Sequence, residues 1–177
     1  LETKGKKIVK ILLDAGYYVT VRPHPMTIRK WPKVIEELEY EFQDNKDFRL
    51  ETDISSHETL SKSFALISDF SGIAYEYAFL LERPVIYVDV PPKTKNPNYE
   101  QIKLEPLEIS IRNKIGKIIS PDELEKIPNL IESTYNNLDL FKLEIPKIRD
   151  NTIFNLNESG KYGAEEILKI LNTMKNP

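Results

Sequence analysis

The stretch SDFSGIAYEYAF, residues 68–79, decides how the fold of this chain is interpreted. An acid, a serine and a glycine are crowded there between two apolar runs, ALI at 65–67 and AFLL at 78–81. A short apolar run bounded by turn-forming residues is typical of a buried strand, and the longer run that follows Gly72 is typical of a helix. The stretch therefore predicts a strand over 65–70 that leads directly into a helix over 71–82.

The same alternation of short strands and helices continues on both sides of this junction. Short segments rich in β-branched and aromatic residues predict further strands at 17–25, 48–53, 84–90 and 114–119. Segments with helical periodicity predict helices at 5–16, 32–42, 55–64, 120–134 and 162–174. Strands separated by helices favour an α/β fold, in which a doubly wound, mostly parallel sheet is covered by helices on both faces.

Local signals also predict where regular structure starts and stops. Ser120, Pro121 and Glu123 form the pattern of a capping box, which places the start of a helix at Ser120. The segment from Pro91 to Arg112 is rich in Pro, Asn and Lys, and we expect it to be a long loop. The segment 136–157 is expected to be irregular apart from isolated helical turns.

Composition limits the class of protein. The 177 residues are enough for one domain with a sizeable core. With 25 basic and 28 acidic residues the net charge is −3, the wrong sign for a domain that holds nucleic acid by its backbone phosphates. The chain has no cysteine and only two histidines, His24 and His57, which argues against a disulfide framework and against a zinc site. We assign His57 to the exposed start of a helix. The chain also has no run of about 18 apolar residues, the length needed to span a membrane.

The strand–helix junction at Ser71 and Gly72 is the first candidate site. In a parallel sheet, ligands bind at the carboxyl ends of the strands, where helix N-termini present free N–H groups to anions. Small residues at the junction leave room for a phosphate, and Glu76 lies one helical turn further on, where its carboxylate can accept hydrogen bonds from a ribose diol. The structural alternative is that Ser71 only caps the helix, Gly72 relieves crowding and Glu76 points into water.

The second candidate site is the segment VRPHP, in which His24 ends a predicted strand and stands between two prolines. The prolines restrict the backbone on both sides and so aim the imidazole in one direction. His24 is then placed to donate a hydrogen bond to a phosphate or to take part in proton transfer. The alternative is a loop histidine between turn-forming residues.

These segments also carry a resemblance to a known family. RPHP, ALISDFSGIAYEYAFLLERPVIYVD, IGKIISPDELEKI and SGKYGAEEILKIL occur in the order and spacing of the C-terminal half of the CDP-glycerol glycerophosphotransferases, bacterial enzymes of teichoic-acid type polymer synthesis. The resemblance covers roughly residues 5 to 172 and implies a Rossmann-like nucleotide-binding domain of the two-domain GT-B architecture. It implies the following roles: His24 faces the donor phosphate as the catalytic residue, and the substrate-binding residues are Arg22, Asp69, Ser71, Gly72 and Glu76.

The resemblance further implies a reaction and a setting. A terminal hydroxyl of the polymer attacks the β-phosphate of a CDP-linked donor and releases CMP, with neither a metal ion nor another cofactor. Residues 1–177 are then expected to be a single nucleotide-binding domain and a fragment of a larger cytoplasmic transferase, peripheral to the inner face of the membrane. We expect the isolated chain to be inactive, because the acceptor domain lies elsewhere, and to form a homodimer that covers apolar surface left by an absent central strand.

Two other functions are compatible with the same residues. One is a GT-B glycosyltransferase or epimerase domain that uses a UDP- or CMP-linked sugar. The other is a non-catalytic interaction domain that keeps the fold without the chemistry, because a fold alone does not determine a function.

Overall fold

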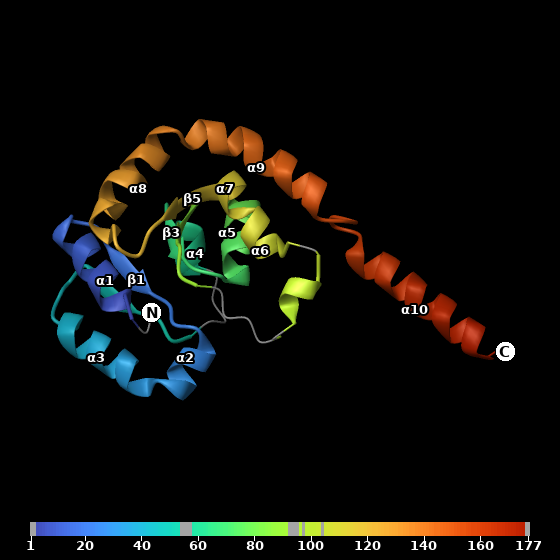
Figure 1. Ribbon diagram of the computed structural model, residues 1–177, viewed down its shortest axis with the longest axis horizontal. Helices are drawn as coiled ribbons and strands as arrows, with labels where there is room; N and C mark the ends of the chain where they lie inside the picture. The colour runs from blue at the N-terminus through green and yellow to red at the C-terminus, as the bar shows by residue number, and fades with distance from the viewer. Residues whose placement is uncertain (1–2, 54–57, 92–95, 97, 104, 176–177) are drawn as a thin grey trace.

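The computed structural model describes residues 3–53, 58–91, 96, 98–103 and 105–175. Helices and strands alternate along most of the chain (Figure 1). The strands are β1 (Val19–Val21), β2 (Phe48–Leu50), β3 (Leu66–Ser68), β4 (Val85–Val88) and β5 (Gly116–Ile119). The helices are α1 (Gly5–Asp14), α2 (Pro25–Lys30), α3 (Pro32–Phe42), α4 (Glu58–Lys62), α5 (Gly72–Leu81), α6 (Leu107–Ser110), α7 (Arg112–Ile115), α8 (Ile127–Asn136), α9 (Leu138–Thr152) and α10 (Ser159–Lys175), with two short 3₁₀ helices, η1 (Tyr99–Gln101) and η2 (Leu124–Lys126).

All described strands pair in parallel, and the α/β class predicted from the sequence is confirmed. The strands form two sheets rather than the expected one, with the orders β1-β2 and β3-β4-β5. The two sheets are joined through side chains: Val19 and Val21 of β1 belong to the same hydrophobic cluster as Ile86 and Val88 of β4. Apolar packing, not a hydrogen-bonded ladder, therefore connects the two halves of the domain.

Strand β4 is the centre of the larger sheet and is buried on both faces. Ile86 and Val88 pack in the first hydrophobic cluster, with side chains of α1, α3, α8, β1 and β5. Val85 and Tyr87 pack in the second cluster, with side chains of α5, α7 and α9. Because alternate residues of a strand point to opposite faces, helices cover both sides of this sheet, as the continuous apolar run of β4 predicts.

Two segments that we expected to be irregular contain helices. The expected loop from Pro91 to Arg112 includes α6 and leads directly into α7, and the segment 136–157 contains the whole of α9. Pro146 lies inside α9, although a proline within a helix costs about 3 kcal/mol. The preceding residue, Ile145, is completely buried in the second cluster, so tertiary packing of α9 offsets the local cost.

The expected capping box at Ser120 does not form. The Ser120 hydroxyl accepts a hydrogen bond from the backbone N–H of Asp122 at 3.2 Å, and the Glu123 carboxylate is bonded to Lys126. Helix α8 begins instead at Ile127, with Pro128 in its first turn. A helix that started at Ser120 would place Pro128 in its interior, where proline removes a hydrogen bond.

Helix α10 extends away from the rest of the molecule (Figure 1), and its described side chains are exposed. Its apolar residues, among them Ile167 and Leu171, therefore pack against no core among the residues that the structure describes. Within the described part of the chain, no helix combines the length and the apolar character needed to cross a membrane.

Candidate functional site

The junction between β3 and α5 has the geometry of an open helix start. Ser71 is the N-cap of α5 in the extended conformation usual for a cap, with φ −147° and ψ 137°, but its hydroxyl makes no capping hydrogen bond among the described residues. Gly72 is exposed, and a Cβ placed on it would meet no atom within 4 Å. The structural alternative requires a capping bond from the Ser71 hydroxyl and crowding at Gly72, and neither is found among the described residues.

The two acids of the first candidate site lie on either side of that helix start. Asp69 follows β3 and is half-buried, and Glu76 lies on α5 with its side chain exposed. Among the described residues, neither carboxylate makes a hydrogen bond or an ion pair. Both oxygens of Glu76 are thus open to solvent and to a ligand, and this exposure fits the ribose-binding role as well as the structural alternative.

His24 has a structural role that the sequence did not suggest. It is the N-cap of α2, a helix in place of the strand and loop expected at this point, and its Nδ1 accepts a hydrogen bond from the backbone N–H of Met26 at 3.1 Å. When Nδ1 accepts, the neutral ring carries its hydrogen on Nε2. Because the side chain is exposed, Nε2–H is available as a donor to an anionic ligand.

We expect His24→Ala to lower the free energy of unfolding by about 1 kcal/mol, because the substitution removes the cap of α2. His24→Asn should retain most of the stability, since asparagine is a strong N-cap residue. Urea denaturation followed by circular dichroism measures both variants. Equal losses of stability in the two variants would contradict the cap role. If His24→Asn retains its stability, this variant can be used to test whether the imidazole takes part in ligand binding.

Arg22, one of the predicted substrate-binding residues, directly follows β1 and lies beside a buried acid. Its Nε lies 3.9 Å from the Oε2 of Glu51, a residue that follows β2 and is only 7% exposed. The other oxygen of Glu51 accepts a hydrogen bond from the Thr59 hydroxyl at 2.8 Å and lies 3.8 Å from Nη2 of Arg49. The Arg22–Glu51 pair thus ties the ends of β1 and β2 together.

The predicted site residues fall into two groups, one on each sheet. Asp69, Ser71, Gly72 and Glu76 belong to β3 and α5, whereas Arg22 and His24 follow β1. Val21 and Val88, the last residues of β1 and β4, belong to the same hydrophobic cluster. Two separate strand ends, joined by one core, therefore carry the predicted residues.

A further polar cluster at the carboxyl end of the larger sheet was missed by sequence reasoning. Nη1 of Arg112, at the start of α7, donates to Oδ1 of Asp89, which follows β4, at 3.0 Å. The Arg112 guanidinium also lies over the ring of Phe70, 4.4 Å from its centroid, and Phe70 directly precedes Ser71. In the sequence, the acid at the end of the β4 segment was the one signal for this cluster. Its partner Arg112 comes from a segment that was expected to be a loop.

Two tyrosines border this cluster. Burial, with a smaller contribution from the charge of Glu108, raises the pKa of Tyr75 to about 12. Burial also raises the pKa of Tyr87, whose hydroxyl has no hydrogen-bond partner among the described residues. Both phenols therefore keep their proton near pH 7 and are hydrogen-bond donors.

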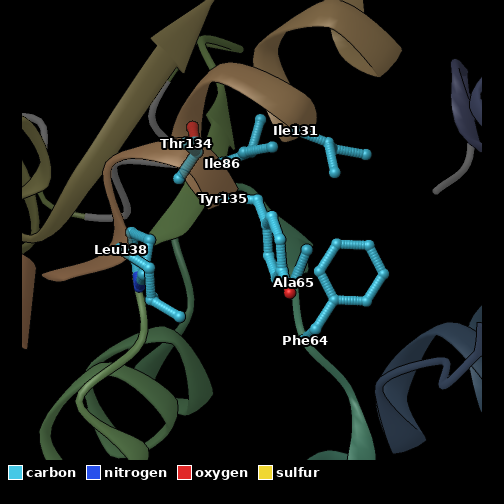
Figure 2. Close-up of a pocket in the computed structure, with 8 residues that line it drawn as sticks. Phe64, Ala65, Ile86, Ile131, Thr134, Tyr135 and Leu138 are labelled. Carbon is cyan, nitrogen blue, oxygen red and sulfur yellow. The ribbon is translucent and has the colours of Figure 1, made fainter.

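A small apolar cavity lies at the opposite end of the same sheet (Figure 2). Phe64 and Ala65, which line it, precede β3, and the facing wall includes Ile131 and Tyr135 of α8. The ring of Phe64 meets that of Tyr135 edge-on, with centroids 6.0 Å apart. With a volume of about 10 Å³, the cavity holds no more than one water molecule and is not a ligand site.

Comparison of the chain with models of known protein families, with curated proteins and with solved structures finds no match.

Proposed function

We propose that this chain is the donor-binding domain of a CDP-glycerol:poly(glycerophosphate) glycerophosphotransferase-like enzyme of GT-B type, which acts in the cytoplasm at the inner face of the membrane. The observation that carries the proposal is the open helix start at Ser71 and Gly72. A glycine that relieves no contact and a serine that makes no capping bond stand where a parallel sheet presents helix amides to a ligand. Both residues are explained if an anion approaches these amides.

The described side chains supply what a nucleotide diphosphate requires at this edge. The amides at the start of α5 stabilise the pyrophosphate, and the exposed carboxylate of Glu76 accepts hydrogen bonds from a ribose diol. His24 offers Nε2–H as a donor to the phosphate that is attacked. In the proposed reaction the acceptor hydroxyl forms a new P–O bond with the β-phosphorus while the P–O bond to CMP breaks, and the site stabilises the charge that develops on the departing phosphate.

Gly72→Ala tests the proposal most directly. We expect the free energy of unfolding to stay the same or to rise slightly, because the new methyl group meets no protein atom and alanine favours helix. We expect the affinity for CDP-glycerol, measured by calorimetry, to fall about tenfold or more, because the methyl group would occupy the space in which the phosphate approaches the amides. An unchanged affinity in the folded variant would contradict the proposal.

The ligand panel for this experiment is CDP-glycerol, CDP-ribitol, UDP-N-acetylglucosamine and CMP. Preference for the CDP compounds supports the phosphotransferase function. Preference for the UDP sugar would favour a glycosyltransferase or epimerase instead. If none of the four binds, the domain is not a nucleotide donor site of this kind.

Glu76→Ala should weaken binding of the same nucleotide by about 1–3 kcal/mol, the scale of charge-assisted hydrogen bonds that are lost. Glu37→Ala is the matched control, because Glu37 is another exposed glutamate on a helix, α3, away from the strand ends. Calorimetry with CDP-glycerol compares the two variants at one ionic strength. Equal dissociation constants for the two variants would remove Glu76 from the site.

A further inference from the structure

Arg112 is buried more deeply than its hydrogen bonds explain. The residue is 6% exposed, and among the described residues its side chain makes one hydrogen bond, to Asp89. Its Nε is enclosed and has no hydrogen-bond partner in the part of the chain that the structure describes. An arginine carries five N–H donors in a planar fork, and a buried donor that stays unpaired is costly. The fold therefore holds the Arg112 side chain in an enclosed position in which Nε has no hydrogen-bond partner among the described residues.

Two aromatic rings lie next to the guanidinium, and one of them belongs to the residue that precedes the start of α5. The guanidinium stacks on Phe70, the residue before the N-cap Ser71, and lies 5.9 Å from the ring centroid of Tyr87. The Tyr87 hydroxyl, on a residue that is 1% exposed, is a second enclosed group without a partner among the residues described. Arg112 and Tyr87 thus each hold an enclosed polar atom without a partner among the described residues, and the guanidinium contacts Phe70, which directly precedes the helix start at Ser71 and Gly72.

The ion pair is open to solvent on the side of the acid. The Asp89 side chain is 53% exposed, compared with 8% for that of Arg112, and it contributes one oxygen to the pair. An exposed carboxylate held by one hydrogen bond is displaced easily, because solvent compensates for the bond that it loses. A phosphate can instead accept two parallel hydrogen bonds from the fork of a guanidinium.

We propose that Arg112 is a phosphate-binding residue, and that a phosphate group bound at the start of α5 replaces the Asp89 carboxylate as its partner. In the free protein Asp89 neutralises the buried guanidinium. In the complex the phosphate neutralises it, and the carboxylate turns to solvent. The inference rests on the proposed function for the place of the phosphate, and it extends that function to a residue distant in the sequence.

The test is a calorimetric titration with inorganic pyrophosphate, without added metal, of the wild-type chain and four variants. We expect Arg112→Met to weaken binding about 10- to 100-fold, the effect of losing charged hydrogen bonds, and Arg112→Lys to weaken it less. Asp89→Asn should tighten binding by a few fold, because it removes the competing charge. Arg149→Met, the control, should leave binding unchanged, since Arg149 lies on α9 and is paired with Glu82 and Asp150.

The Asp89→Asn result decides the inference even if Arg112→Met fails to fold. Weaker or unchanged binding in Asp89→Asn would overturn it, as would unchanged binding in a folded Arg112→Met variant or no pyrophosphate binding at all.

The result of the pyrophosphate titration is distinct from that of the nucleotide panel. If pyrophosphate binds as expected and CDP-glycerol does not bind, the anion site stands and the proposed function fails. If CDP-glycerol binds equally well with and without Arg112, the function stands and this inference fails.

Discussion

Replacing Gly116 by alanine will lower the free energy of unfolding by about 4 kcal/mol or more, which is an exceptional loss for one methyl group. A Cβ at this position would lie 2.0 Å from the carbonyl oxygen of Val85 and 3.1 Å from the ring of Tyr87. Val85 is the register partner of Gly116 in the ladder between β4 and β5, so the clash falls on backbone that is fixed by the sheet. Relief requires β4 and β5 to separate at their amino ends, where Val85 and Gly116 begin the ladder.

The matched control is Gly163→Ala, in the exposed helix α10. A Cβ there meets no atom within 4 Å, and alanine is favoured over glycine in a helix by about 1 kcal/mol. Urea denaturation followed by circular dichroism should therefore show the two identical substitutions acting in opposite directions. A Gly116→Ala protein with the midpoint of the wild type would mean that β5 does not pair with β4 in the register described.

Replacing Glu51 by leucine will lower the free energy of unfolding by about 3–5 kcal/mol, the range observed when one partner of a buried ion pair is removed. Glu51 is 7% exposed, and the Arg22 side chain beside it is 15% exposed, so the substitution leaves a largely enclosed guanidinium next to an apolar group. The bond from the Thr59 hydroxyl is lost as well. The smaller sheet, in which β1 and β2 meet near this residue, should lose its order first.

Arg49→Met is the control for that experiment. Arg49 contacts the same carboxylate at 3.8 Å, but its side chain is 57% exposed, and exposed ion pairs contribute less than about 1 kcal/mol. Thermal or urea unfolding of the two variants separates the enclosed pair from the exposed one. A Glu51→Leu variant no less stable than Arg49→Met would show that the Arg22–Glu51 pair does not stabilise the domain.

Some residues of the predicted site are positioned by neighbouring residues in the sequence, and others by contacts with distant parts of the chain. Ser71 and Gly72 were placed correctly at the start of a helix because an apolar strand, two small residues and an apolar helix follow one another directly in the chain. His24 was predicted to end a strand over 17–25, but β1 ends at Val21. The bond from the backbone N–H of Met26 to His24 and the helix that it caps were not expected. The His-Pro sequence is compatible with both a turn and a helix start, and only the packing of α2 beside α3 selects the helix.

The sequence by itself determined those elements whose signals are local. Short segments of strand-forming residues located all five described strands, and a proline followed by an amphipathic stripe fixed α3 from Pro32 to Phe42. These predictions needed no information about residues elsewhere in the chain, because side-chain periodicity and the backbone restrictions of proline act within a few residues. The α/β class followed from the order of the elements alone.

Tertiary structure decided the features that depend on residues far apart in the chain. Helix α9 contains Pro146 against local preference, and it forms because Ile145 enters a core built by α5, α7 and β4. Asp89 and Phe70 lie at one edge of the sheet because parallel strands bring their carboxyl ends together, and Arg112 reaches both residues from α7, which precedes β5. The division of the strands into two sheets has the same origin, since hydrogen bonding between strands and burial of a shared core are set by the whole fold, and no local pattern encodes either one.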